Sequence, residues 1–252
     1  MLIKAAINGG RTKAEHAAVP VTPDEQAADV VACLKSGAGA IHLHVRVTSA
    51  ASSSSEKESL DAVDLARTVL AVRAAAPDAA VGISTGPWIL PHPARLQAAA
   101  AWEVLPDFAS VNFSEEGATE LASLLLSRRV EVEAGLCTAA DALTLLKSGL
   151  AARCIRVLLE PQEQEMERAL ETVNTMEQVL QVLAKGAQFP RLLLHGTEAT
   201  AWPMLAEAIA RGYDGRIGLE DTLVMPNGMT AKDNAELVSE AVRRMREVSN
   251  EQ

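Results

Sequence analysis

Residues 40–46 read Ala-Ile-His-Leu-His-Val-Arg (AIHLHVR), a short apolar and β-branched run that is typical of a buried strand. Seven more runs of this kind occur along the chain, and their spacing averages about 30 residues, which is the size of one β-α unit. They are LIKAAI (2–7), VGIS (81–84), FASVNF (108–113), VEVE (130–133), CIRVLL (154–159), RLLLH (191–195) and RIGLE (216–220).

The segments between these runs have the pattern of amphipathic helices. Thr22-Pro23-Asp24-Glu25 predicts a helix start, because Thr can cap the helix, Pro suits the first turn and Glu completes a capping box. Ala27, Val31 and Leu34 then share one face, and Ser36-Gly37 predicts the helix end.

A similar helix is expected to start at Thr230-Ala231-Lys232-Asp233, with Leu237, Ala241 and Met245 on its inner face. Strands that alternate with helices indicate a parallel sheet. Eight such units in 252 residues indicate an α/β fold, a closed (β/α)8 TIM barrel formed as one domain by residues 1–252. A doubly wound open sheet is the alternative.

The composition limits the function. Lys and Arg number 23 and Asp and Glu number 33, so the net charge is −10, and aromatic residues make up only 3% of the chain. A nucleic-acid binder needs a basic footprint or a base-stacking surface, so we expect no nucleic-acid partner. A small anionic substrate held by a few arginines remains compatible with this charge.

Three features point to a cytoplasmic protein. Cys33, Cys137 and Cys154 are far apart and odd in number, which argues against a disulfide framework. The N-terminal MLIKAAINGG has no signal-peptide core, and no apolar run is long enough for a membrane span. We therefore expect a reducing compartment and no membrane partner. The serine-rich stretch at 49–57 is either a flexible connector or a mobile lid.

Polar residues follow nearly every predicted strand, at the end where barrel enzymes build their active sites. The residues at this rim that we predict to contact a substrate are Asn8, Arg11, Thr85, Gly86, Asn112, Ser114 and Glu133. The glycines in Asn8-Gly9-Gly10 suggest a tight turn with close backbone approach. No G-x-G-x-x-G, Walker lysine or G-x-S-x-G frame is present, so a Rossmann, P-loop or hydrolase-elbow interpretation fails.

His42 and His44 lie two residues apart on a predicted strand, so both point to the same side. Two histidines and one carboxylate with an open position form a catalytic zinc arrangement. Glu220 on the closing strand can supply that carboxylate, and the alternative is a pair of hydrogen-bonded core histidines. Asp221 is either a base or a helix cap, whereas Arg216 can tune nearby carboxylates, grip a substrate carboxylate or form a structural ion pair.

These residues, in this order, resemble the β-keto acid cleavage enzyme family, whose founding activity is 3-keto-5-aminohexanoate cleavage. The resemblance runs through nearly the whole chain and includes AAINGGRTKAEHAAVPVTPDE, GAGAIHLHVR, ISTG, VNFSEEG, VEVEAG and RIGLEDT. The combination of HLHVR after the Asn-Gly turn with Gly-Leu-Glu-Asp near the end is specific.

The resemblance implies a zinc-dependent barrel with one Zn²⁺ per chain, held by His42, His44 and Glu220. It also implies that Asp221 acts as the base, positioned with Arg216 and Ser84. The substrate would be a small β-keto acid and acetyl-CoA the co-substrate, in a retro-Claisen reaction that gives acetoacetate and a new acyl-CoA. A homo-oligomer, commonly a tetramer, is implied as well.

The chain departs from the family pattern at several positions. Val47 stands where an aspartate is usual, Arg11 lies near the place of an acidic residue, and residues 160–165 (EPQEQE) replace a glycine-rich loop that serves acyl-CoA. Two other functions therefore stay open: a divalent-metal carbon–carbon lyase of the aldolase type without CoA, and a metabolite-binding barrel without turnover. The joint presence of Asp221, Ser84 and Arg216 favours retained catalysis.

Overall fold

The computed structural model describes residues 1–48, 56–184 and 190–250. Its strands pair in the order of the chain, all parallel, and β1 pairs with β8 to close the sheet. Their bounds are β1 Ile3–Ala6, β2 Ala40–Leu43, β3 Val81–Ser84, β4 Phe108–Asn112, β5 Glu131–Leu136, β6 Arg156–Leu159, β7 Arg191–Leu194 and β8 Asp214–Ile217.

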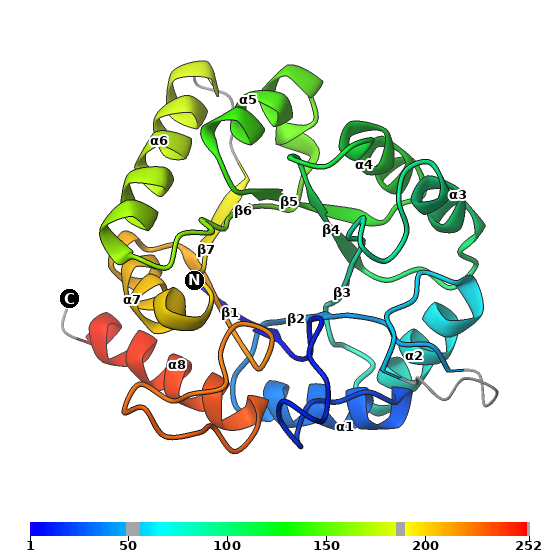
Figure 1. The fold of residues 1–252 in the computed structure, drawn as a ribbon, viewed down its shortest axis with the longest axis horizontal. Helices are drawn as coiled ribbons and strands as arrows, with labels where there is room; N and C mark the ends of the chain where they lie inside the picture. The colour runs from blue at the N-terminus through cyan, green and yellow to red at the C-terminus, as the bar shows by residue number, and fades with distance from the viewer. Residues whose placement is uncertain (49–55, 185–189, 251–252) are drawn as a thin grey trace.

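A helix follows each strand, so the fold is the (β/α)8 barrel that the sequence predicts. Figure 1 shows the strands as an inner ring enclosed by an outer ring of helices. The helices are α1 Pro23–Lys35, α2 Ala62–Ala75, α3 Ala94–Ala101, α4 Ala118–Ser127, α5 Ala139–Ser148, α6 Met166–Ala184, α7 Ala201–Arg211 and α8 Asn234–Asn250, with short 3₁₀ turns at Ala151–Arg153 and Glu198–Thr200. Within the described residues, no helix is long and apolar enough to cross a membrane.

The helix α1 starts as predicted, with Thr22 and Glu25 forming a reciprocal capping box. The predicted buried face is partly wrong, because Val31 and Leu34 are only half-buried. The structure instead buries Gln26, Ala27, Val30 and Cys33. Gln26 points inward because its amide donates a hydrogen bond of 2.9 Å to the carbonyl oxygen of His44.

The start predicted for the last helix is also wrong. α8 begins at Asn234 rather than at Thr230, because the backbone near Thr230 pairs with Val224 in an isolated bridge. Asp233 caps the helix by accepting from the backbone N–H of Glu236. The inner face is as predicted, since Leu237 and Ala241 are fully buried and Met245 packs against the core.

Two strands, β2 and β8, end three residues before the ends of the apolar runs that predict them. β2 ends at Leu43, because Val45 and Val47 pair with residues 57–59 instead of continuing the sheet. β8 ends at Ile217, so Glu220 lies on the following turn and not on the strand. Most of the serine-rich stretch, residues 49–55, lies outside the described residues.

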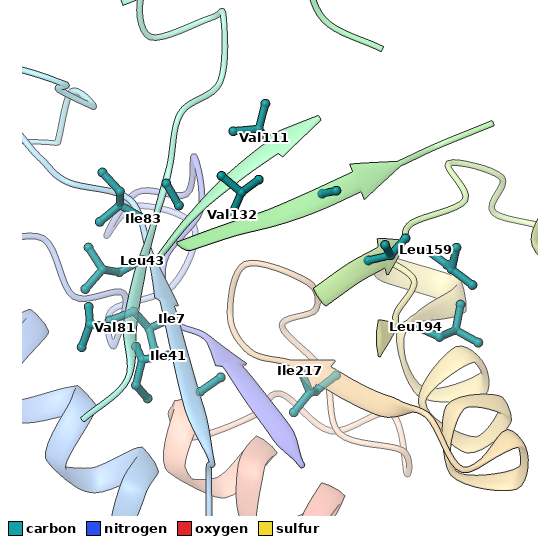
Figure 2. Packing of buried hydrophobic residues seen from close by; sticks show 14 of the residues in the cluster. Ile7, Ile41, Leu43, Val81, Ile83, Val111, Val132, Leu159, Leu194 and Ile217 are labelled. Atoms are coloured by element: carbon teal, nitrogen blue, oxygen red, sulfur yellow. The ribbon is translucent and has the colours of Figure 1, made fainter. Parts of the chain in front are cut away.

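The hydrophobic core lies between the sheet and the helices. Ile41 and Leu43 on β2 and Val81 and Ile83 on β3 are buried and lie side by side in Figure 2. Because side chains alternate along a strand, His42 points to the opposite side, into the barrel.

The barrel interior beneath the rim carries buried charges instead of an apolar filling. Lys4 on β1 forms an ion pair with Glu133 on β5, and both side chains are fully buried. Arg156 on β6 lies 3.1 Å from the second oxygen of Glu133 and over the ring of Phe108. Burial alone would raise the pKa of Glu133, but Lys4 and Arg156 outweigh burial and hold it below its usual value.

This network makes Lys4 a sensitive position. We expect Lys4→Met to lower the free energy of unfolding by about 3–5 kcal/mol, because Glu133 keeps its buried charge and loses its closest cation. Chemical denaturation at neutral pH measures this value. Lys232→Ala is the matched control, since Lys232 is 84% exposed and should change stability little. Equal stability of the two variants would contradict a supporting role for the Lys4–Glu133 pair.

Candidate functional site

A cavity of about 300 Å³ opens at the C-terminal ends of the strands. Its walls come from β2, β3, β4, β6 and β8 and from the segments that follow these strands and β1. His42, His44, Glu220 and Arg216 all line this cavity. The barrel therefore brings the two predicted histidines and the predicted carboxylate to one place.

The three predicted metal ligands lie close enough to share one ion. Glu220 Oε2 is 3.7 Å from His42 Nε2, and Glu220 Oε1 is 3.5 Å from His44 Nε2. One ligand atom from each of the three residues lies within 4.8 Å of the others. Two imidazoles and a carboxylate form a donor set that divalent zinc and related ions accept.

Both histidines turn the same nitrogen toward Glu220, because their other nitrogen is occupied. The Nδ1 atom of His42 lies 3.3 Å from Ser110 Oγ, and that hydroxyl is 3.5 Å from Glu133. The Nδ1 atom of His44 contacts Glu58 Oε1. Partners at Nδ1 are the usual support of metal-binding histidines and leave Nε2 available.

Glu220 is held as an anion. Burial alone would raise its pKa, but Arg216 and the two histidines outweigh burial and hold its pKa well below the usual value. One oxygen contacts Arg216, whereas Oε2 is buried with no hydrogen-bond donor. A buried carboxylate oxygen without a donor suits a cation, so the residues fit the metal that the sequence predicts.

The Asn8-Gly9-Gly10 turn, for which the sequence predicts a close backbone approach, lies against the side chain of Glu220. Gly9 has a φ of +51°, and a Cβ at this position would lie 2.4 Å from Glu220 Cγ. Asn8 is fully buried and bonded to the backbone, with its amide donating to the carbonyl oxygens of Pro20 and His44. Its side chain thus shapes the turn, and its predicted substrate contact stays a prediction.

Arg216 contacts both acidic residues of the turn. Its guanidinium donates to Asp221 from Nε at 3.1 Å and from a terminal nitrogen at 2.7 Å. Asp221 is fully buried, and His195 Nδ1 lies 3.6 Å from it. On its other side, His195 Nε2 lies 3.4 Å from Glu160, which lines the cavity. The structure places Asp221 beside the site, and its role as base stays a prediction.

The remaining predicted residues divide into two groups. Ser84, Gly86 and Asn112 line the cavity. The other four do not line it. The hydroxyl of Thr85 donates to the backbone carbonyl of Ser110, and Ser114 is exposed. Arg11 forms ion pairs with Glu15 and Glu198, and Glu133 belongs to the buried charge network.

Seven cavity residues were not among the predicted site residues: Gly10, Glu58, Trp88, Ser110, Glu115, Leu158 and Glu160. Ser110 lies on β4 two residues before Asn112, and Glu115 and Glu160 follow strands, so attention to strand faces and ends could have found them. No pattern in the sequence links Glu58 to His44, because their contact depends on the antiparallel bridge between Arg46 and Glu58.

Known proteins resemble this chain along its full length. The family model described as beta-keto acid cleavage enzyme matches residues 1–252. The 3-keto-5-aminohexanoate cleavage enzyme of Fusobacterium nucleatum is 25% identical over 271 residues, which cover 100% of this chain and 93% of that protein.

Two solved structures share the fold. The apo structure of ObcA matches with a TM-score of 0.71 and 16% identity, over 92% of this chain and 62% of that chain. The ternary complex of ObcA with C4-CoA adduct and oxalate has the same TM-score and identity and is covered to 64%. This chain thus spans less than two thirds of the length of ObcA.

The electrostatics of the site predict different titrations for the two histidines. Burial would lower the pKa of His44, but Glu220 and Glu58 outweigh burial and raise its pKa to about 8. Burial dominates at His42 and holds its pKa well below the usual value. In protein freed of divalent ions, His44 should therefore keep its proton as the pH rises to about 8, whereas His42 stays neutral over the same range.

Nuclear magnetic resonance of ¹⁵N-labelled imidazoles across a pH series measures both midpoints. A His44 midpoint at or below its ordinary value of about 6.5 would show that Glu58 and Glu220 do not stabilise the cation.

Proposed function

The chain belongs to the β-keto acid cleavage enzyme family, and we propose that it cleaves a small β-keto acid with acetyl-CoA in a zinc-dependent reaction. The products would be acetoacetate and a new acyl-CoA. The observation that carries this proposal is the cluster of His42, His44 and Glu220, whose ligand atoms face one another at the cavity. The full-length match to the 3-keto-5-aminohexanoate cleavage enzyme supports the substrate class.

His42, His44 and Glu220 would hold the metal. A bound divalent cation would polarise the keto group of the substrate and stabilise the negative charge of an enolate. The ion pairs of Arg216 with Glu220 and Asp221 fix both carboxylates in the turn after β8. The pairing leaves Glu220 Oε2 without a donor and so open to the cation.

We assign the proton transfer to Asp221 and substrate orientation to Ser84 and Asn112. The latter two side chains line the cavity from β3 and β4, where a hydroxyl and an amide can hold the carboxylate or keto oxygen of the substrate. Arg216 orients the Asp221 carboxylate through bonds from two of its nitrogens. Asp221 would accept the proton from the carbon between the two carbonyl groups.

The test is an assay of zinc-loaded protein with a panel of β-keto acids in the presence and absence of acetyl-CoA. The proposal expects acetoacetate and a new CoA ester to appear together, and only with acetyl-CoA. Cleavage without acetyl-CoA would instead establish a lyase of the aldolase type. Binding of a keto acid with no turnover in either arm would indicate a metabolite-binding barrel.

The ligand set makes a prediction on metal content. Untagged protein should carry about one zinc per chain, and His44→Ala should lose most of it, because two remaining ligands rarely retain the ion. Elemental analysis after dialysis measures both values. Glu115→Ala is a control, since Glu115 lines the same cavity but pairs with Arg95. Full zinc occupancy in His44→Ala would rule out this ligand set.

The role of Asp221 makes a separate prediction. Asp221→Asn should keep the zinc and the fold but lose about 10²–10⁴-fold in turnover, because a positioned base contributes a factor of that size. Turnover, zinc content and melting temperature should be measured on one preparation. Wild-type turnover in this variant would exclude Asp221 as the base, and joint loss of zinc and turnover would place it among the supports of the metal.

A further inference from the structure

We propose that Glu58 and Trp88 clamp His44 so that its Nε2 atom faces the metal, which makes Glu58 a positioning residue of the site. This inference rests on the proposed metal site. It concerns two residues outside the predicted ligand set and outside the predicted catalytic group.

Both carboxylate oxygens of Glu58 are engaged in the clamp. Oε1 contacts His44 Nδ1, and Oε2 accepts a hydrogen bond of 2.9 Å from the indole Nε1 of Trp88. The side chain of Glu58 is 13% exposed, so little water competes for either contact. A carboxylate held at both oxygens has a fixed orientation and can fix that of its partner.

The backbone around Glu58 is anchored to the segment that carries His44. Arg46 and Glu58 form an antiparallel bridge, flanked by hydrogen bonds from Val47 N to the Lys57 carbonyl and from Ser59 N to the Val45 carbonyl. A guanidinium nitrogen of Arg46 also donates to the carbonyl oxygen of Glu56 at 2.8 Å. Glu58 is therefore held on a short ladder that begins immediately after His44.

Trp88 contacts both Glu58 and the imidazole of His44. Its ring stacks on the His44 imidazole with centroids 6.3 Å apart and planes inclined by 22°. The indole reaches this position over Gly86, where a Cβ would lie 2.2 Å from the ring. Trp88 is 60% exposed, so burial of its own surface does not explain its placement. The hydrogen bond to Glu58 and the stacking on His44 do explain it.

The contacts with Glu58 and Trp88 favour one tautomer of the neutral His44 imidazole. A neutral imidazole carries its proton on one nitrogen and a lone pair on the other. A carboxylate at Nδ1 favours the proton there, which leaves the lone pair on Nε2, 3.5 Å from Glu220. At His42, the partner of Nδ1 is the neutral hydroxyl of Ser110. Of the two histidines, His44 is therefore the one with a carboxylate at Nδ1.

The experiment compares Glu58→Ala, Glu58→Gln and Trp88→Phe with the wild type in two measurements. Zinc affinity by chelator competition should fall about 10–100-fold in Glu58→Ala, the usual loss when such a support is removed. Glu58→Gln should recover part of the lost zinc affinity, because its amide oxygen can still accept a hydrogen bond from Nδ1 of His44. Trp88→Phe keeps an aromatic ring but removes the N–H that donates to Glu58. Its zinc affinity should fall less than that of Glu58→Ala.

Glu56→Ala is the matched control. It removes a carboxylate from the same segment, and its side chain accepts from the backbone of Lys13 rather than from a histidine. Its zinc affinity should equal that of the wild type. Melting temperatures show whether each variant is folded, and Glu58→Gln and Trp88→Phe carry the test should Glu58→Ala unfold.

The second measurement needs no metal. In metal-free protein at a pH at which His44 is neutral, ¹⁵N resonances should show His44 with its proton on Nδ1, and this preference should weaken in Glu58→Ala. Zinc binding by the wild type, with unchanged affinity and unchanged His44 resonances in Glu58→Ala, would overturn the clamp and leave the proposed function intact. A wild type that binds no zinc would remove the metal site, and with it the role of the clamp.

Discussion

The pairing of β1 with β8 is the contact on which the site depends. It closes the sheet, and only a closed sheet places the turn after β8 beside the end of β2. The three potential ligands come from opposite ends of the sequence, and no local interaction would bring them together. In an open sheet with the same strands, Glu220 and His42 would lie at separate edges. The proposed metal site is therefore a property of the closed barrel rather than of any one strand.

The charges around the cavity form two layers. In the lower layer, Lys4 and Arg156 compensate Glu133 inside the barrel. In the upper layer, Arg216 compensates Glu220 and Asp221. Ser110 connects the layers, because its hydroxyl lies between His42 and Glu133. Burying a charge network of this kind costs desolvation energy, but its ion pairs and hydrogen bonds fix the orientation of the side chains. It therefore suits a site whose side chains must keep fixed positions.

The sequence predicts the barrel and the paired histidines from short-range patterns, whereas Glu220 joins the predicted ligand set through the closing strand and the family resemblance. Strand runs, capping residues such as Thr22 and the spacing of His42 and His44 are local signals, and the structure agrees with the barrel. Contacts across the barrel have no local signal. Glu58 reaches His44 only because the chain returns antiparallel to residues 45–47, and Glu133 appears at the rim in sequence but lies in the buried ion network. The strand ends of β2 and β8 differ from prediction for the same reason, since tertiary hydrogen bonds replace the sheet there.

The position of Glu220 shows how two glycines make a carboxylate available. After β8 the chain crosses the end of β1, and a Cβ on Gly218 would lie 1.9 Å from the carbonyl oxygen of Ala6. That carbonyl accepts from the backbone N–H of Glu220, so the crossing is itself bonded. On the other side, Gly9 leaves the space that the side chain of Glu220 fills. A larger residue at either position would displace the turn, and the carboxylate would lose its alignment with His42 and His44. The glycines in Asn-Gly-Gly and Gly-Leu-Glu-Asp are thus as necessary to this arrangement as His42, His44 and Glu220 themselves.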